Sequence, residues 1–113
     1  SKTTNLERAI EEEGQRILKA IPNNCDIIAL DVNGKNHSTE SLANLMETWL
    51  HSGRDIALLI GGADGLSKSC LSQANSKWSL SNLTFPHPLV RVILAEQVYR
   101  AWSLMNNHPY HRA

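Results

Sequence analysis

The feature that most constrains the fold is a buried strand that runs directly into a glycine-rich loop. Residues 56–60 (IALLI) contain no polar side chain, which is typical of a strand covered on both faces, and residues 61–65 (GGADG) follow at once. Another apolar run, residues 25–30, and a brief strand at residues 77–80 are separated from it by helical patterns. Helices that alternate with apolar strands predict an α/β fold with a mainly parallel sheet flanked by helices.

Four helices are expected around these strands. Thr4 has the spacing of a capping box for the first helix, Ser38 or Thr39 can cap the second, and Gly53 ends it. The dipeptide Asn33-Gly34 predicts a turn after the first strand. The expected bounds of the helices are residues 4–21, 38–53, 67–76 and 88–105.

Length and composition indicate one domain that spans residues 1–113. Hydrophobic residues make up 42% of the chain and charged residues 19%, as in ordinary globular proteins. No apolar run approaches the roughly 20 residues of a membrane span. Cys25 and Cys70 lack metal-ligand spacing and are expected to be buried thiols in a reduced compartment. We therefore expect a cytoplasmic protein without a metal.

The charges are balanced in total but not in their distribution. A net charge of zero argues against a protein that holds nucleic acid by bulk electrostatics. Residues 1–13 are mainly acidic, whereas residues 78–113 carry three arginines and three histidines against a single glutamate. This asymmetry indicates a local surface for anions near the C-terminus, or else a chance distribution on a solvated surface.

Ligands of parallel sheets bind beyond the carboxyl ends of the strands, which here means residue 30, residues 61–65 and residues 81–87. The glycines of the second segment allow backbone amides to approach a phosphate, a ribose or a carboxylate. Their spacing does not match a dinucleotide or P-loop motif, and a tight turn without a ligand is the alternative. The residues alone do not choose the ligand.

The segment 81–88 is irregular because it contains Pro86 and Pro88. It is interpreted as a rigid wall for a flat ligand such as adenine, or as a loop that covers the core with Leu83 and Phe85. His87 is held between the two prolines, and a structural role competes with a catalytic one. The three tryptophans are assigned to packing first: Trp49, Trp78 and Trp102.

The last helix has apolar residues around most of its circumference, which indicates burial on several sides and a possible contact with a second subunit. Glu96 and Arg100 have the spacing of an ordinary surface pair. Residues 107–112 combine arginine, histidine and tyrosine, which suits contact with phosphate and base. A frayed chain end is the alternative.

Long segments of the chain resemble a known family. Residues 59–67 (LIGGADGLS), 78–91 (WSLSNLTFPHPLVR), 96–103 (EQVYRAWS) and 107–112 (NHPYHR) closely resemble the ribosomal RNA large subunit methyltransferase H family, which are SPOUT-class pseudouridine N3-methyltransferases. The resemblance covers essentially the whole chain. It implies an α/β-knot fold with a C-terminal trefoil knot, a homodimer, and N3-methylation of a pseudouridine in 23S ribosomal RNA on the assembled ribosome.

The resemblance also implies S-adenosylmethionine as the cofactor, bound in the knot. By position, the implied cofactor residues are Leu30, Gly61, Gly62, Leu80, Ser81, Asn82, Leu83, Thr84 and Phe85. The implied substrate-side and catalytic set is His87, Arg100, Tyr110, His111 and Arg112. In this set the arginines anchor phosphate or a base carbonyl, and His87 or a tail residue of the partner subunit assists proton removal.

The chain departs from the family at its start. Family members open with a further strand before the helix that begins here near Thr4, so we expect this chain to lack that first strand. The main alternative function is a non-catalytic knotted dimer that binds a nucleotide-like ligand or RNA. A nucleotide-using or NAD-using enzyme is disfavoured by the absent dinucleotide motif.

Overall fold

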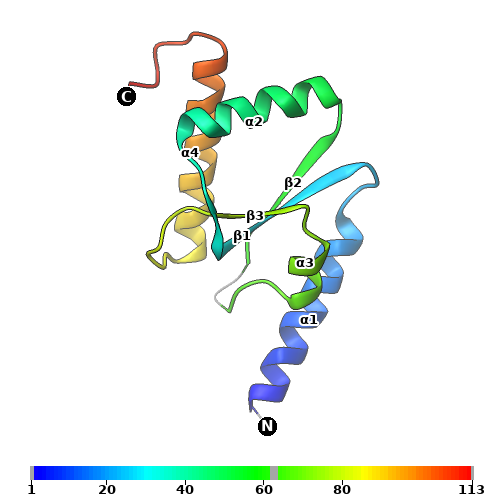
Figure 1. The fold of residues 1–113 in the computed structure, drawn as a ribbon. Helices are drawn as coiled ribbons and strands as arrows, with labels where there is room; N and C mark the ends of the chain where they lie inside the picture. The colour runs from blue at the N-terminus through cyan, green and yellow to red at the C-terminus, as the bar shows by residue number, and fades with distance from the viewer. Residues whose placement is uncertain (1, 62–63, 113) are drawn as a thin grey trace.

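The computed structural model describes residues 2–61 and 64–112. Three strands form one parallel sheet in the order β2-β1-β3, which confirms the predicted sheet with flanking helices. Figure 1 shows the elements, which are α1 (Lys2–Ala20), β1 (Cys25–Asn36), α2 (Thr39–Ser52), β2 (Asp55–Leu59), α3 (Lys68–Gln73), β3 (Ser76–Ser79) and α4 (His87–Met105).

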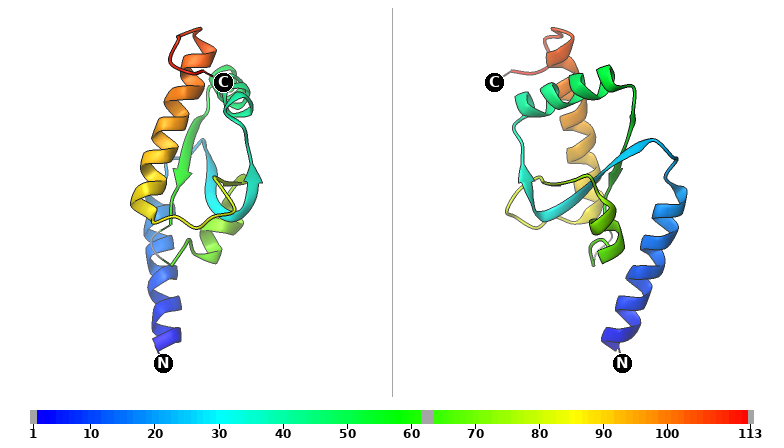
Figure 2. Two further views of the ribbon diagram at one scale, coloured as in Figure 1. Left: turned by 90° about the vertical axis from the view of Figure 1, so that its left-hand side faces the viewer. Right: turned by 45° about the vertical axis from the view of Figure 1, so that its right-hand side comes forward.

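The helices form two pairs. Helix α2 packs against α4, and α1 packs against α3, which also contacts β1. Figures 1 and 2 show α2 above the sheet and α1 with α3 below it, and the N-terminal half of α1 extends away from the rest of the chain. Within the part of the chain that the structure describes, no helix combines the length and the apolar character that crossing a bilayer requires.

Strand β1 is longer than predicted, and the expected turn at Asn33-Gly34 is wrong. The strand continues to Asn36, and Trp78 of β3 is in register with both Leu30 and Lys35, so β1 has an irregularity between these two positions. A Cβ on Gly34 would lie 2.6 Å from the carbonyl carbon of Trp78. Gly34 is therefore needed for the close approach of two strands.

The predicted ends of α2 are confirmed. The hydroxyl of Ser38 accepts a hydrogen bond from the backbone N–H of Ser41 at 3.0 Å. Gly53 ends the helix with φ +70°, and its N–H donates to the carbonyl of Trp49 at 3.1 Å. These are the contacts that satisfy backbone groups at helix termini.

The capping box at Thr4 is wrong. Helix α1 already begins at Lys2, so Thr4 lies inside its first turns. A capping residue must precede the helix that it caps, and Thr4 does not.

Gly14 is the buried residue of α1, and a Cβ there would lie 2.0 Å from the Oγ of Ser67. The absence of a side chain at Gly14 lets α1 lie directly on the start of α3. Ser69 of α3 also donates a hydrogen bond to Glu11.

The core lies between the sheet and the pair α2 and α4. Its buried residues are Ile28, Leu42, Ala43, Trp78 and Ala101. Trp49 stacks on Trp78 with ring centroids 5.7 Å apart, as expected for packing residues. The assignment of Trp102 to packing is wrong within this chain, since it is 43% exposed. Leu50 is 72% exposed although it continues the apolar stripe of α2. Leu50 thus remains largely uncovered within the described chain, and Trp102 is covered only in part, its ring lying 5.9 Å from that of His108.

Candidate functional site

Residues 30–32 within β1 and the loops that follow β2 and β3 surround one cavity of about 890 Å³. This volume lies in the usual range for small-molecule sites. The lining is formed by Leu30, Asp31, Val32, Ile60, Gly61, Asp64, Gly65, Leu66, Trp78, Ser79, Leu80, Ser81, Leu83, Thr84, Phe85, Pro86, His87, Pro88 and Val90. The cavity therefore lies where the sequence predicts a ligand site, and its size suits a small molecule.

Most of the expected cofactor residues line this cavity. They are Leu30, Gly61, Leu80, Ser81, Leu83, Thr84 and Phe85. Asn82 is exposed and is not part of the lining, and Gly62 lies outside the described residues. Sequence reasoning did not select Asp31, Val32 or Trp78. The position of Asp31 and Val32 just after Leu30 was the signal that pointed to them, because that position was expected to be a strand end.

The loop after β3 is held by its own polar groups. The hydroxyl of Ser79 donates to the carbonyl of Ser81 at 2.8 Å, and the hydroxyl of Ser81 accepts from the N–H of Leu83 at 3.0 Å. Leu83 is 68% exposed even though it lines the cavity. The alternative in which Leu83 covers the core is therefore wrong, and its side chain is free to contact a ligand.

The glycine loop after β2 folds tightly on itself. A Cβ on Gly61 would lie 2.5 Å from the carbonyl carbon of Gly65 and 2.7 Å from the backbone nitrogen of Leu66. Gly65 has φ +85°, a conformation that glycine adopts without strain. These glycines close the loop on one side of the cavity and leave its backbone accessible to a ligand.

The charged groups of the cavity are acidic. Asp31 and Asp64 are carboxylates in a lining that has neither lysine nor arginine among its described residues. Asp31 also accepts a hydrogen bond from the N–H of Asn33 at 3.2 Å, which orients its carboxylate. His87 lies in the first turn of α4 and is half-buried at the cavity wall. The cavity therefore combines an apolar lining with acidic groups that favour a cationic ligand and one histidine that can exchange a proton.

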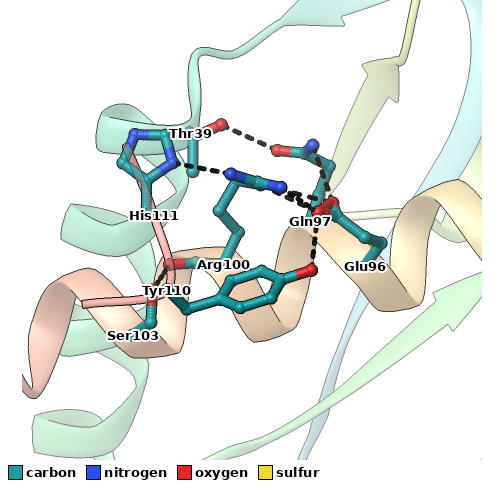
Figure 3. Close-up of polar contacts among 7 residues, drawn as sticks. All are labelled: Thr39, Glu96, Gln97, Arg100, Ser103, Tyr110 and His111. Carbon is teal, nitrogen blue, oxygen red and sulfur yellow. Dashed lines mark hydrogen bonds and ion pairs between the residues drawn. The ribbon is translucent and has the colours of Figure 1, made fainter. Parts of the chain in front are cut away.

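Two of the other expected catalytic residues, Tyr110 and His111, gather elsewhere, around Arg100 near the end of α4 (Figure 3). Its Nε and Nη2 donate to Oε1 of Glu96 at 2.8 and 2.5 Å. Its Nη1 lies 3.3 Å from Nδ1 of His111, and its guanidinium lies 4.9 Å from the ring centroid of Tyr110. Residues 108–112, here called the tail, are therefore folded back on α4 rather than frayed.

The ion pair between Glu96 and Arg100 shifts the pKa of both side chains. Hydrogen bonds from Arg100 are the main reason that the pKa of Glu96 is lowered, and Glu96 in turn raises the pKa of Arg100. The hydroxyl of Tyr110 donates to Glu96 at 3.4 Å. Glu96 and Arg100 are thus the centre of a polar cluster that holds the tail, and are more than the isolated surface pair of the alternative interpretation.

Within one chain, the expected site residues lie in two separate places, the cavity with His87 and the cluster around Arg100. His87 and Arg100 lie about 20 Å apart along the axis of α4 at a rise of about 1.5 Å per residue. Arg112 is exposed at the end of the tail. The structure therefore gathers Arg100, Tyr110 and His111 but leaves His87 at the separate cavity.

Between these sets, α4 borders an apolar groove. Its volume is about 640 Å³, and its lining is Met46, Leu58, Arg91, Leu94, Ala95, Val98, Tyr99 and Trp102. Tyr99 and Trp102 stack with ring centroids 5.6 Å apart and are each 43% exposed. Exposed aromatic and aliphatic groups of this kind often mark an interface. Within residues 2–61 and 64–112, no three histidine, cysteine, aspartate or glutamate side chains are grouped as metal ligands.

The chain is similar in sequence to proteins of one known family. The family described as "Predicted SPOUT methyltransferase" matches residues 1–111. A protein of Methylococcus capsulatus named ribosomal RNA large subunit methyltransferase H is 57% identical over 99% of this chain and 72% of its own length. Proteins of the same name from Thioalkalivibrio sulfidiphilus and Alkalilimnicola ehrlichii are 59% and 60% identical, over 98% and 94% of this chain and 71% and 68% of their own lengths. The chain therefore belongs to the SPOUT methyltransferase family, among the relatives named ribosomal RNA large subunit methyltransferase H.

Proposed function

We propose that this protein methylates N3 of a pseudouridine in 23S ribosomal RNA, on the assembled ribosome, with S-adenosylmethionine as the methyl donor. The observation that carries the proposal is the cavity at the strand ends, lined by seven of the expected cofactor positions and by His87, in a chain of a methyltransferase family. The name of the relatives supports ribosomal RNA as the substrate. The trefoil knot and a cytoplasmic location belong to the same proposal.

The residues of the cavity fit S-adenosylmethionine. The lining is mostly apolar and suits adenine, the glycine loop exposes backbone near the cavity, and Asp31 and Asp64 suit a cation. The group, when bound, supplies an electrophilic methyl on a positively charged sulfur. Leu30, Leu83 and Phe85 would hold its adenine and exclude water, which leaves alignment of the nucleophile as the main task of the protein.

Methyl transfer to N3 requires loss of the N3 proton as the new N–C bond forms and the C–S bond breaks. His87 is positioned at the cavity wall to accept this proton, or a tail residue of the partner subunit accepts it. Arg112 is exposed and would contact phosphate or a base carbonyl, while Arg100 anchors the tail beside it. These roles require the tail and the cavity to meet.

A homodimer would bring them together. The apolar groove on α4 lies between the cavity and the tail, and Trp102 exposes 43% of its surface there, while Val92 of the same helix is 64% exposed. A second copy of the chain packed on this face would cover these residues and bring its tail toward the cavity of the first copy. The single chain then has an incomplete site, as the separation of His87 from Arg100 indicates.

The test uses labelled S-adenosylmethionine and intact ribosomes that lack the modification. Label should appear at one pseudouridine of the large-subunit RNA, and mapping of the methyl group identifies the position. His87→Ala should lower kcat by about 100-fold or more, as expected for loss of a general base. Arg100→Ala should also lower it. Full methylation by either variant, with the dimer intact, would refute the assigned role. Cofactor binding without any transfer would favour the non-catalytic alternative.

Subunit mixing tests the composite site. His87→Ala and Arg112→Ala chains, each inactive alone, should recover activity when unfolded and refolded together. Mixed dimers would contain one intact site, so recovery should approach about one quarter of the wild-type activity for random pairing. No recovery, in a preparation shown to contain mixed dimers, would place all catalytic groups in one chain.

A further inference from the structure

His111 joins the tail to two helices. Its side chain is 10% exposed, in a segment whose other residues are exposed. Nδ1 lies 3.3 Å from Nη1 of Arg100 on α4, and Nε2 lies 3.4 Å from Oε1 of Glu40 in the first turn of α2. One imidazole ring therefore bridges α4 and α2, and Figure 3 shows its contact with Arg100.

The two partners of the ring determine where its proton lies. A guanidinium N–H only donates, so Nδ1 of His111 must accept and carries no proton. An ionised carboxylate only accepts, so Nε2 must carry the proton that Glu40 receives. A neutral ring with hydrogen on Nε2 satisfies both partners. A doubly protonated ring would direct an N–H toward the N–H of Arg100.

The charged groups around the ring support this hydrogen-bond pattern. Glu40 faces the ring from α2, and Arg100 and Glu96 face it from α4. The pKa of Glu40 is lowered, first by a hydrogen bond with its own backbone N–H and then by its hydrogen bond with His111. The pKa of Glu96 is lowered mainly by hydrogen bonds from Arg100. Both glutamates therefore remain ionised hydrogen-bond acceptors above the ordinary carboxyl range.

We propose that Glu40 is a positioning residue that docks the tail. It accepts the Nε2–H of His111, holds the ring in one tautomer, and so directs the Nδ1 lone pair to Arg100. Resting on the proposed function, the consequence is that Glu40 sets the position of Tyr110 and Arg112 without touching RNA or cofactor. Glu40 of α2 thereby controls the geometry of the proposed substrate-contacting residues, which lie in the tail and on α4.

The first test measures the ring directly, in full-length protein with ¹⁵N-labelled histidine at neutral pH. In the wild type, Nδ1 of His111 should give the NMR shift of an unprotonated nitrogen and Nε2 that of a protonated one. Glu40→Ala should release the ring from α2 and thereby from Arg100, so that both signals move toward values averaged between tautomers. Glu40→Gln should restore them because its amide oxygen still accepts. Glu47→Ala, an exposed glutamate of the same helix, is the matched control and should change nothing.

The second test measures methyl transfer to ribosomes. Glu40→Ala should lower kcat by about tenfold through misplacement of the tail, with unchanged KM for S-adenosylmethionine and an unchanged Tm. Glu40→Gln should recover most of the loss, and Glu47→Ala should behave as wild type. Wild-type ring signals or wild-type kcat in Glu40→Ala would overturn the proposal. If the wild-type protein methylates no ribosome, the proposed function fails, and the ring signals still decide whether Glu40 docks the tail.

Discussion

Replacement of Gly61 by alanine tests whether the glycine loop shapes the cavity. The new Cβ would lie 2.5 Å from the carbonyl carbon of Gly65 and 2.7 Å from the backbone nitrogen of Leu66. Both contacts are with backbone, which cannot move aside as a flexible side chain would. Inserting a methyl group into a closely packed site costs about 1–3 kcal/mol. The loop must therefore open, or the protein must carry this strain.

The strain can lower either the free energy of unfolding or the affinity for S-adenosylmethionine, so both quantities are measured. If the loop opens in the free protein, binding must close it again, and a cost of about 1–3 kcal/mol raises the Kd for S-adenosylmethionine by about 5- to 150-fold. If the loop stays closed, the same cost lowers the free energy of unfolding. Isothermal titration calorimetry gives the first quantity, and urea denaturation at fixed protein concentration gives the second.

Gly53→Ala is the matched control. Gly53 also follows a regular element and has φ +70°, but a Cβ there meets nothing within 4 Å. It should cost only the backbone strain of about 1–2 kcal/mol in stability and leave the affinity for S-adenosylmethionine unchanged. If Gly61→Ala kept both its affinity and its stability within about 0.5 kcal/mol of wild type, a value typical of neutral surface changes, the reasoning from the loop geometry would be refuted.

Two further predictions concern the sheet and the tail. Gly34→Ala should lower the free energy of unfolding by about 1–3 kcal/mol or more, measured in urea, because its Cβ would lie 2.6 Å from the backbone of Trp78; a cost below that of Gly53→Ala would contradict this. The lowered pKa of Glu96 means that its ion pair stabilises the tail above the ordinary carboxyl pKa of about 4.3 and is lost as pH falls through the lowered value. NMR signals of the Tyr110 ring should therefore shift as the pH falls below about 4, and signals unchanged from there down to pH 2 would contradict this.

The sheet and the cavity were predictable from the sequence because their signals are local. The apolar run at 56–60 and the glycines that follow it specify a buried strand and a close turn without reference to the rest of the chain. Because the strands are parallel, the loops that follow them lie at the same edge of the sheet. Trp78 lies at the cavity because β3 is in register with Leu30 of β1, and the periodicity of the sequence does not reveal this pairing.

The errors came from contacts between distant segments. Asn33-Gly34 has the composition of a turn, but the missing side chain serves the approach of β1 to β3, and only the paired strand reveals this. The position of the tail was likewise open, since Arg100, Tyr110 and His111 are brought together by the fold of the chain end onto α4. Tertiary contacts here override local propensity.

The distribution of apolar residues on α4 has a physical reason in the proposed homodimer. One side of the helix packs on α2 within the chain, and Leu94 and Ala101 are buried there. Val92 lies on the side away from Leu94 and Ala101 and is 64% exposed, and Leu89 and Trp102 are also exposed on α4, although exposed apolar surface is unfavourable in water. A helix that packs within one chain needs a single apolar side, whereas a helix that also packs against a second copy needs two. The same helix begins at the cavity and ends at the tail, so pairing through its second side would fix the distance between these two parts of a composite site.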